Sequence, residues 1–179
     1  DGCCRFITQD GTEHYVNGQW DLIIAHPPCT YLTNGGAVQM FRKEVKEYPP
    51  YGTFQMVNVE RLKKGIKARD FFMQCLNAKC ERIAIENPVP MSIYMLPKAS
   101  QAIQPYDFGD AYSKKTYLWI RGLPPLMPTE LLANKQPYIN GGGGRLDRAN
   151  YKGKKFATNS KTRSETFPGI AEAMADQWG

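Results

Sequence analysis

Apolar residues along the chain fall into two patterns: short continuous runs, and longer stretches with helical spacing. The run "WDLIIA" at residues 20–25 is apolar and contains β-branched side chains, which predicts a strand buried on both faces of a parallel sheet. Shorter runs at 83–85 ("IAI") and 116–120 ("TYLWI") predict two further strands. Each run ends at proline or glycine within a few residues.

Two stretches repeat apolar residues at the spacing of an amphipathic helix. In "VERLKKGIKARDFFMQCL", residues 59–76, apolar side chains that include Ile66 and Phe72 share one side, and basic side chains lie largely on the other. The pattern "PGIAEAMADQW" at 168–178 predicts a short closing helix. Residues 30–58, which are polar and contain Gly and Pro, and residues 1–11 predict neither a helix nor a strand.

The order of these elements predicts an α/β protein with an open, mostly parallel sheet. Two strands joined by a helical crossover of this length form a right-handed β-α-β unit, so their carboxyl ends lie at one edge of the sheet, where ligands bind. A chain of 179 residues with 42% hydrophobic residues can bury one core of its own. We expect an α/β domain over residues 1–124, a basic Gly-rich segment over 125–163 and a helix returning to the domain over 164–179.

The cysteine content indicates a reducing compartment. Five cysteines form an odd set without the paired spacing of a zinc site, and nothing in front of them has the pattern of a signal peptide. No apolar stretch approaches the roughly 18 to 20 residues that a membrane-spanning helix needs. We therefore expect a cytoplasmic protein that binds neither a membrane nor a metal ion.

The positive charge of the chain is concentrated in one segment. The formal net charge is +6, and residues 141–163 alone carry seven cations against one acid. Such a segment binds nucleic-acid phosphate without regard to base sequence, and four glycines in front of it form a flexible tether. An alternative is a basic loop without a partner. The candidate DNA contacts are Arg145, Arg148, Lys152, Lys154, Lys155, Lys161 and Arg163.

Chemically reactive side chains follow the first two strands of the predicted parallel unit. Cys29 comes after His26-Pro27-Pro28, and Glu86 comes directly after the second run. Proline fixes the backbone direction, so a thiol and a carboxyl group are expected to face one crevice as a nucleophile and an acid. The alternatives are a small buried cysteine and a solvated glutamate in a turn. His26 either tunes Cys29 or fills space beside it.

Four motifs in this order resemble those of the DNA (cytosine-5)-methyltransferases, and the similarity is greatest to compact members encoded by bacteriophages. The stretch "HPPCTYLTNGG" resembles the Pro-Cys loop of that family, and "IENP" resembles its Glu-Asn motif. The stretch "IQPYDFGDAYSKKTYLWI" resembles the turn, basic pair and strand that follow, although the family's usual Gln-x-Arg-x-Arg is replaced by Tyr112, Ser113, Lys114 and Lys115. The end of the chain, "RSETFPGIAEAMADQWG", resembles the last motif.

The resemblance implies the sheet of S-adenosylmethionine-dependent (Rossmann-like) methyltransferases and transfer of a methyl group to carbon 5 of cytosine in DNA. It implies that Cys29 adds to carbon 6 of a flipped base, that Glu86, with Asn87, contacts ring N3 and the exocyclic amine, and that Lys114 and Lys115 hold phosphate or support the Cys29 loop. A solvated lysine pair is the alternative. The implied cofactor contacts are Pro27, Pro28, Ser164, Thr166 and Gly169.

One part of the family pattern is not found. The Gly-rich turn that holds S-adenosylmethionine would precede residue 20, and no such turn is present there, so the first strands of the sheet are expected to be missing from this chain. Two further functions therefore stand beside the methyltransferase: a catalytically silent DNA-binding relative, and an enzyme that uses the same thiol addition to make another carbon-5 modification. Amino-directed methyltransferases fit less well, because their loop has an aromatic residue where Cys29 stands.

Overall fold

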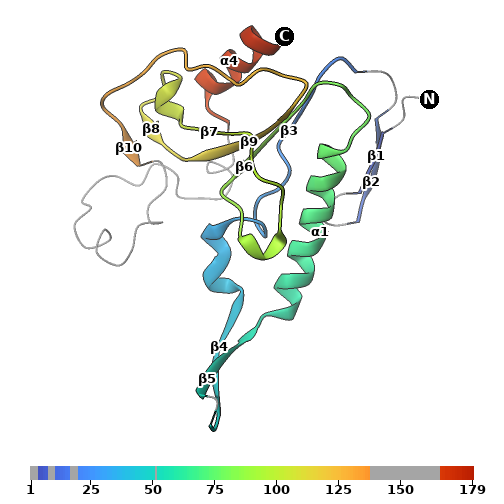
Figure 1. Cartoon of the computed structure of the whole chain (residues 1–179), viewed down its shortest axis with the longest axis vertical. Coiled ribbons are helices and arrows are strands. Elements are labelled where there is room, and N and C mark those ends of the chain that lie inside the picture. Colours follow the sequence, from blue (N-terminus) through green and yellow to red (C-terminus); the bar gives the residue numbers. More distant parts are fainter. Residues whose placement is uncertain (1–3, 8–10, 17–19, 51, 138–165) are drawn as a thin grey trace. The chain divides into compact units, whose positions relative to one another are not determined.

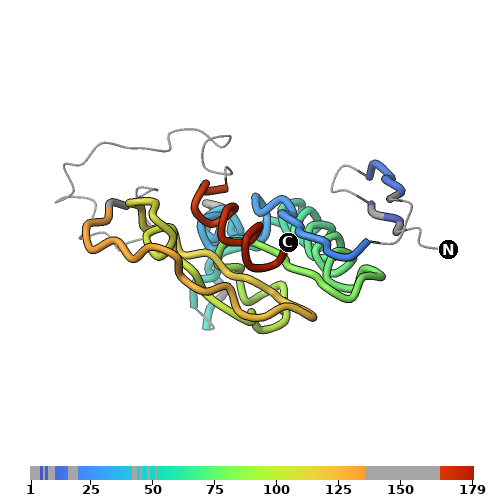
Figure 2. The backbone as a smooth tube through the Cα atoms, turned by 90° about the horizontal axis from the view of Figure 1, so that it is seen from above, coloured from blue at the N-terminus to red at the C-terminus, as the bar shows by residue number. Residues whose placement is uncertain are grey.

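A computed structural model describes residues 4–7, 11–16, 20–50, 52–137 and 166–179 of the chain (Figures 1 and 2). These residues fall into two compact units. The first comprises Asp1–Ser100 and Tyr117–Leu123, and the second comprises Gln101–Thr116 and Pro124–Gly179. None of the helices in the described ranges is long and apolar enough to cross a membrane.

The central sheet is mixed and has four strands, in the order β3-β6-β9-β7. The strands are β3 (Ile23–Ala25), β6 (Ile83–Pro88), β9 (Thr116–Arg121) and β7 (Gln101–Ile103). β3 and β6 run parallel, with Ile23 opposite Ile83 and Ala25 opposite Ile85, and α1 (Val59–Leu76) lies between them in the chain. The α/β class and the parallel pair joined by a helix are therefore confirmed.

β3 differs from its prediction in length and in burial. It spans three residues, and Ile24 is 39% exposed, so the expectation of a strand buried on both faces is wrong. The reason is its place in the sheet, because β3 is at the end of the order of described strands and has only β6 beside it.

The core of the first unit lies where α1 packs against the sheet. Phe72 of α1 meets Trp119 of β9 edge to face, with ring centroids 4.9 Å apart, and Ile83 and Ile85 of β6 are fully buried in the same cluster. Ile66 is 46% exposed, so its expected place on the buried side of α1 is wrong. The small residues Gly65 and Ala68 are buried in its place, along with Phe72 and Cys75.

Gly65 allows a close approach of α1 to the following loop. A Cβ atom at this position would lie 1.8 Å from the hydroxyl oxygen of Tyr94, which is itself buried. Farther along the same helix, Arg69 donates from Nε to the carbonyl oxygen of Tyr94 at 2.9 Å. α1 is therefore fixed to this loop by direct packing and by a hydrogen bond.

Two antiparallel hairpins occur where neither a helix nor a strand was expected. They are β1 (Cys4–Ile7) with β2 (Glu13–Val16), and β4 (Phe41–Tyr48) with β5 (Gly52–Val57). Residues 1–11 and 30–58 were therefore wrongly read as lacking strands. None of these four strands contains a long continuous apolar run, so the sequence gives only a weak strand signal there.

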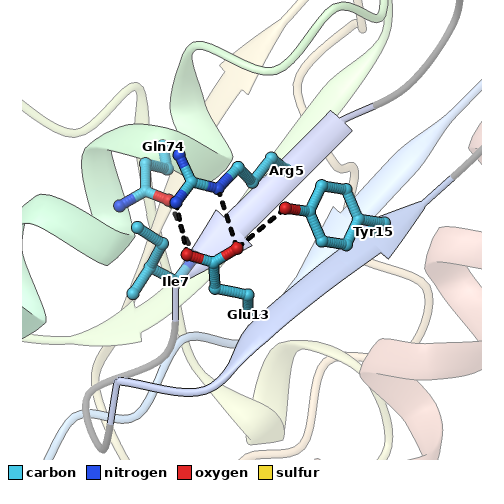
Figure 3. Close-up of polar contacts among 5 residues, drawn as sticks. All are labelled: Arg5, Ile7, Glu13, Tyr15 and Gln74. Atoms are coloured by element: carbon cyan, nitrogen blue, oxygen red, sulfur yellow. Dashed lines mark hydrogen bonds and ion pairs between the residues drawn. The ribbon is translucent and has the colours of Figure 1, made fainter.

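The first hairpin lies beside α1, where the backbone N–H of Ile7 donates to Oε1 of Gln74 at 3.0 Å (Figures 1–3). On its exposed side, Arg5 forms an ion pair with Glu13, and the hydroxyl group of Tyr15 donates to Glu13 Oε2 at 2.7 Å (Figure 3). The hydrogen bond from Arg5 lowers the pKa of the Glu13 carboxyl group. This surface network is screened by solvent and adds little stability.

The second unit is built around α4 (Pro168–Trp178), which confirms the expected closing helix, and around β8 (Tyr112–Ser113), which pairs in parallel with β10 (Gln136–Pro137). The indole N–H of Trp178 donates to the carbonyl oxygen of Pro124 at 3.1 Å, and Gln177 makes two hydrogen bonds with the backbone of Met127. Three short 3-10 helices complete the described elements. η1 (Asn34–Gln39) and η2 (Ser92–Tyr94) belong to the first unit, and η3 (Pro105–Asp107) belongs to the second.

Candidate active site

The candidate site forms at the carboxyl end of β3, beside the last residues of β6. β6 continues through Glu86 and Asn87 to Pro88, so the expected end of this strand at Ile85 is wrong. Because Ala25 is paired with Ile85 in parallel register, the residues that follow them, His26 and Glu86, come next at the same edge of the sheet. His26 begins the loop that carries Pro27, Pro28 and Cys29. The parallel register thus brings the start of the cysteine-bearing loop to the glutamate. The described side-chain contact with Glu86 is made by His26, and the expected placement of the Cys29 thiol against the carboxyl group stays a prediction.

A side-chain contact joins His26, the residue after β3, to Glu86 of β6. Nδ1 of His26 lies 3.1 Å from Oε2 of Glu86, within hydrogen-bonding distance. The side chain of Glu86 is 18% exposed and that of His26 is 41% exposed. The carboxyl group is therefore the more enclosed partner, and the imidazole ring reaches solvent.

Asn87 of β6 holds the backbone of the loop that carries Cys29. Its side chain is fully buried, and Nδ2 donates to the carbonyl oxygen of Pro27 at 2.9 Å. Its Oδ1 is buried without a hydrogen-bond partner among the described residues. Asn87 was expected beside Glu86 as part of the catalytic motif. In the structure it holds the backbone of the cysteine loop in place.

Farther along, the loop after Cys29 is tied to the segment after β6. Thr33 and Pro90 form an antiparallel bridge, and the backbone N–H of Met91 donates to the carbonyl oxygen of Leu32 at 2.7 Å. Together with Asn87, these bonds fix the loop on both sides of Cys29. The loop is therefore a rigid part of the first unit.

Cys29 is half-buried and carries a thiol. Its carbonyl oxygen accepts hydrogen bonds from the N–H groups of Leu32 and Thr33, at 3.0 and 3.1 Å, which closes a tight turn directly behind the thiol-bearing residue. This turn limits the movement of Cys29 along the edge of the sheet.

Two cations of α1 lie against this turn. Nη2 of Arg61 donates to the carbonyl oxygen of Thr30 at 3.0 Å, and its guanidinium carbon lies 5.2 Å from the ring centroid of Tyr31. Nζ of Lys64 lies 5.7 Å from the same centroid. Neither cation forms an ion pair with a carboxylate within the described part of the chain. The segment after Cys29 is thus in a positively charged environment.

Arg61 was not identified from the sequence, where it is one of several basic residues of α1. Its side-chain contact with Thr30 depends on the fold. Asn58 caps the start of α1 by accepting from the backbone N–H of Arg61 at 3.1 Å. Gly36 provides the space, because a Cβ atom there would lie 2.2 Å from Nη2 of Arg61. The sequence carries no spacing signal for this contact.

The other expected residues of the described chain lie in the second unit. Nζ of Lys114 lies 5.4 Å from the ring centroid of Phe167, which follows the exposed Thr166, and Lys115 is exposed. The N–H of Gly169 donates to Oδ2 of Asp110 at 3.0 Å. A Cβ atom at Gly169 would lie 1.8 Å from the carbonyl oxygen of Phe108, so close packing explains the glycine.

The expected cofactor contacts are divided between the two units, with Pro27 and Pro28 in the first and Thr166 and Gly169 in the second. The carbonyl oxygen of Pro27 already accepts from Asn87, and the N–H of Gly169 is bonded to Asp110. Pro28 is exposed and has no N–H group, and Ser164 lies outside the described residues.

The basic segment also lies outside the described residues. This holds for all seven candidate DNA contacts, Arg145, Arg148, Lys152, Lys154, Lys155, Lys161 and Arg163. Within the ranges that the structure describes, no group of three or more His, Cys, Asp and Glu side chains could hold a metal ion.

Taken together, the carboxyl end of β3 and the adjacent part of β6 carry an imidazole ring and a carboxyl group in contact, and the half-buried Cys29 follows in a loop that hydrogen bonds tie to β6 and the segment after it. A thiol can add to an electron-poor double bond, and a hydrogen-bonded carboxyl group can take up the charge that the addition creates. No protein-family model and no curated protein matches the sequence.

Proposed function

We propose that this protein acts on cytosine in DNA as a DNA (cytosine-5)-methyltransferase, with Cys29 as the nucleophile and Glu86 as its partner. The observation that carries the proposal is the parallel pairing of β3 with β6, which brings the start of the Cys29 loop to Glu86 at one edge of the sheet. The order and spacing of the motifs support the same family.

Carbon 5 of cytosine is a poor nucleophile, so the ring must first gain electron density. The sulfur of Cys29, as a thiolate, forms a bond to carbon 6, and the electron pair of the 5,6 double bond moves into the ring toward N3. Glu86 donates a proton to N3 or shares one with it, which stabilises the negative charge as it develops. Once carbon 5 is substituted, a base removes its proton, the 5,6 double bond re-forms and the sulfur leaves.

The surroundings of the Cys29 loop support a thiolate at this position. A thiol reacts only as its anion, and nearby cations favour that form. Arg61 is bonded to the residue directly after Cys29, and Lys64 lies over the next side chain. The rigid turn behind Cys29 reduces the loss of conformational entropy when the sulfur meets a base.

The substrate must present cytosine outside the base stack, either flipped from a duplex or in a single strand. The segment 141–163 supplies the phosphate contacts in this proposal, and Lys114 adds another. The methyl donor implied by the resemblance is S-adenosylmethionine. Activation of the ring is the part of the reaction to which the described residues contribute.

Exchange of the carbon-5 hydrogen tests ring activation without a methyl donor. Addition of Cys29 turns carbon 5 into a carbanion that takes a proton from water, so incubation of cytosine-containing DNA in D2O should incorporate deuterium at carbon 5. Mass spectrometry of the nucleosides measures this, and Cys29→Ser should abolish it. Cys80→Ser is the matched control, because this thiol is also half-buried but donates to the carbonyl oxygen of Trp20 at 3.1 Å.

Trapping tests the complete reaction. With S-adenosylmethionine and DNA that contains 5-fluorocytosine, the protein should form a stable covalent adduct that Cys29→Ser removes and Cys80→Ser keeps. Wild-type protein that neither exchanges the hydrogen nor forms the adduct, while it still binds DNA, would instead be a binding protein. A new mass at carbon 5 other than that of methyl would identify a different modification.

A further inference from the structure

His26 occupies a position that the proposed reaction leaves without a role. It stands between β3 and the two prolines, and its Nδ1 lies 3.1 Å from Oε2 of Glu86. From the sequence, His26 was expected either to tune Cys29 or to fill space beside it. The structure instead places its ring against the carboxyl group.

The geometry of this pair is fixed on both sides by the backbone. The parallel register of Ala25 with Ile85 sets the positions of His26 and Glu86, and the bond from Asn87 to the carbonyl oxygen of Pro27 holds the residue after His26. The contact between the imidazole and the carboxyl group therefore does not depend on two long, freely rotating side chains.

The two side chains differ in exposure, which sets the direction in which a proton can enter the pair from solvent. The carboxyl side chain is 18% exposed, whereas the imidazole side chain is 41% exposed. Within the described ranges, Glu86 has no other ion-pair partner, and the thiol of Cys29 is carried by the same loop as His26. A proton can thus pass from water to the imidazole ring and from the ring to the more enclosed carboxyl group.

We propose that His26 is a proton relay that acts through Glu86, a role that rests on the proposed function. The two carboxyl oxygens then serve different partners, Oε2 facing His26 and Oε1 facing ring N3. As the sulfur–carbon 6 bond forms, the proton on Oε1 moves to N3, and the Nδ1 proton of imidazolium His26 moves to Oε2. When the sulfur leaves, the N3 proton returns to Oε1 and the Oε2 proton returns to Nδ1, so no proton is gained or lost.

The test uses carbon-5 hydrogen exchange by the full chain, with three variants. His26→Ala removes the relay and should slow exchange by on the order of tenfold or more, with little change in DNA affinity. Because the histidine is partly exposed, added imidazole should enter the vacated site and restore exchange. His26→Asn can still donate one hydrogen bond to Glu86 but cannot carry a proton onward, so it should remain slow. His14→Gln, at the other histidine, is the control and should behave as wild type.

The outcomes separate this role from a purely structural one. If His26→Asn exchanges at the wild-type rate, or if imidazole does not restore His26→Ala, then His26 only positions Glu86 and the relay is wrong. If the wild-type protein itself shows no exchange, the proposed function fails, and the relay fails with it. If the wild type and His26→Ala exchange equally fast, only the relay is overturned. Circular dichroism of each variant verifies that the fold is intact.

Discussion

The side-chain amide of Asn87 donates to the carbonyl oxygen of Pro27 at 2.9 Å, across the ends of two parallel strands that lie 60 residues apart in the chain. We predict that Asn87→Ala lowers the free energy of unfolding by about 1–3 kcal/mol, because a buried carbonyl group loses its donor. It should also loosen the loop and change the alkylation rate of Cys29. Chemical denaturation and iodoacetamide labelling measure the two effects. Asn77→Ala, at the exposed end of α1, is the control and should do neither.

Arg61 and Arg69 offer a matched pair on one helix. Each donates to a backbone carbonyl oxygen of a loop, at 3.0 and 2.9 Å, but only Arg61 contacts the segment after Cys29. We predict that replacing either by alanine costs about 1 kcal/mol of stability, whereas only Arg61→Ala slows alkylation of Cys29, because it removes a nearby cation. Equal labelling rates in the two variants would rule out a role for Arg61 at the thiol.

Gly65→Ala should destabilise the protein although alanine is the better helix former. The added Cβ atom would lie 1.8 Å from the hydroxyl oxygen of Tyr94, so we expect a loss of about 1–3 kcal/mol from overpacking. The same Cβ atom would lie 2.1 Å from Cζ and 2.4 Å from Cε1 of Tyr94, so relief of the clash requires removal of the whole ring, as in Tyr94→Ala. Gly65→Ala should therefore cost less stability in the Tyr94→Ala background than in the wild type. Thermal unfolding of the wild type, the two single variants and the double variant gives the coupling energy, and additive effects would contradict the proposed clash.

Cys75 makes stability depend on pH in the alkaline range. Burial raises the pKa of this thiol from 9.0 to about 11. Between these values the unfolded chain loses the proton and the folded chain keeps it, so the folded state binds more protons and its stability falls as pH rises from about 9 to about 11. The full loss is about 3 kcal/mol. Denaturation at pH 8 and pH 11 measures it, and Cys75→Ala, which removes the titrating group, should reduce the difference.

The elements of the fold were predictable where apolar residues follow a clear helical spacing or a continuous run. The apolar spacing of residues 59–76 and 168–178 predicted α1 and α4 with their observed bounds, and "IAI" predicted the buried part of β6. The two hairpins were missed because no continuous apolar run marks their strands, although β4 spans eight residues. Ile66 was placed on the wrong side of α1 because Gly65 and Ala68, which carry little hydrophobic signal, form the face of closest contact.

The candidate site was predictable in its location and less so in its contacts. Parallel strands required the segments after residues 25 and 85 to share an edge, and they do. The partner of His26 depends on the register of β3 with β6, and the contact of Arg61 with Thr30 depends on the space left by Gly36. Neither the register nor that space is encoded in a local pattern of residues.

The shortness of β3 has a consequence for association between molecules. A strand at the end of a sheet exposes backbone donors and acceptors that can pair with another chain and start aggregation. β3 offers only three residues for such pairing, and Pro27 and Pro28, which follow close behind, have no N–H to donate. The same prolines that direct the Cys29 loop therefore also limit how far a foreign strand could pair beyond β3.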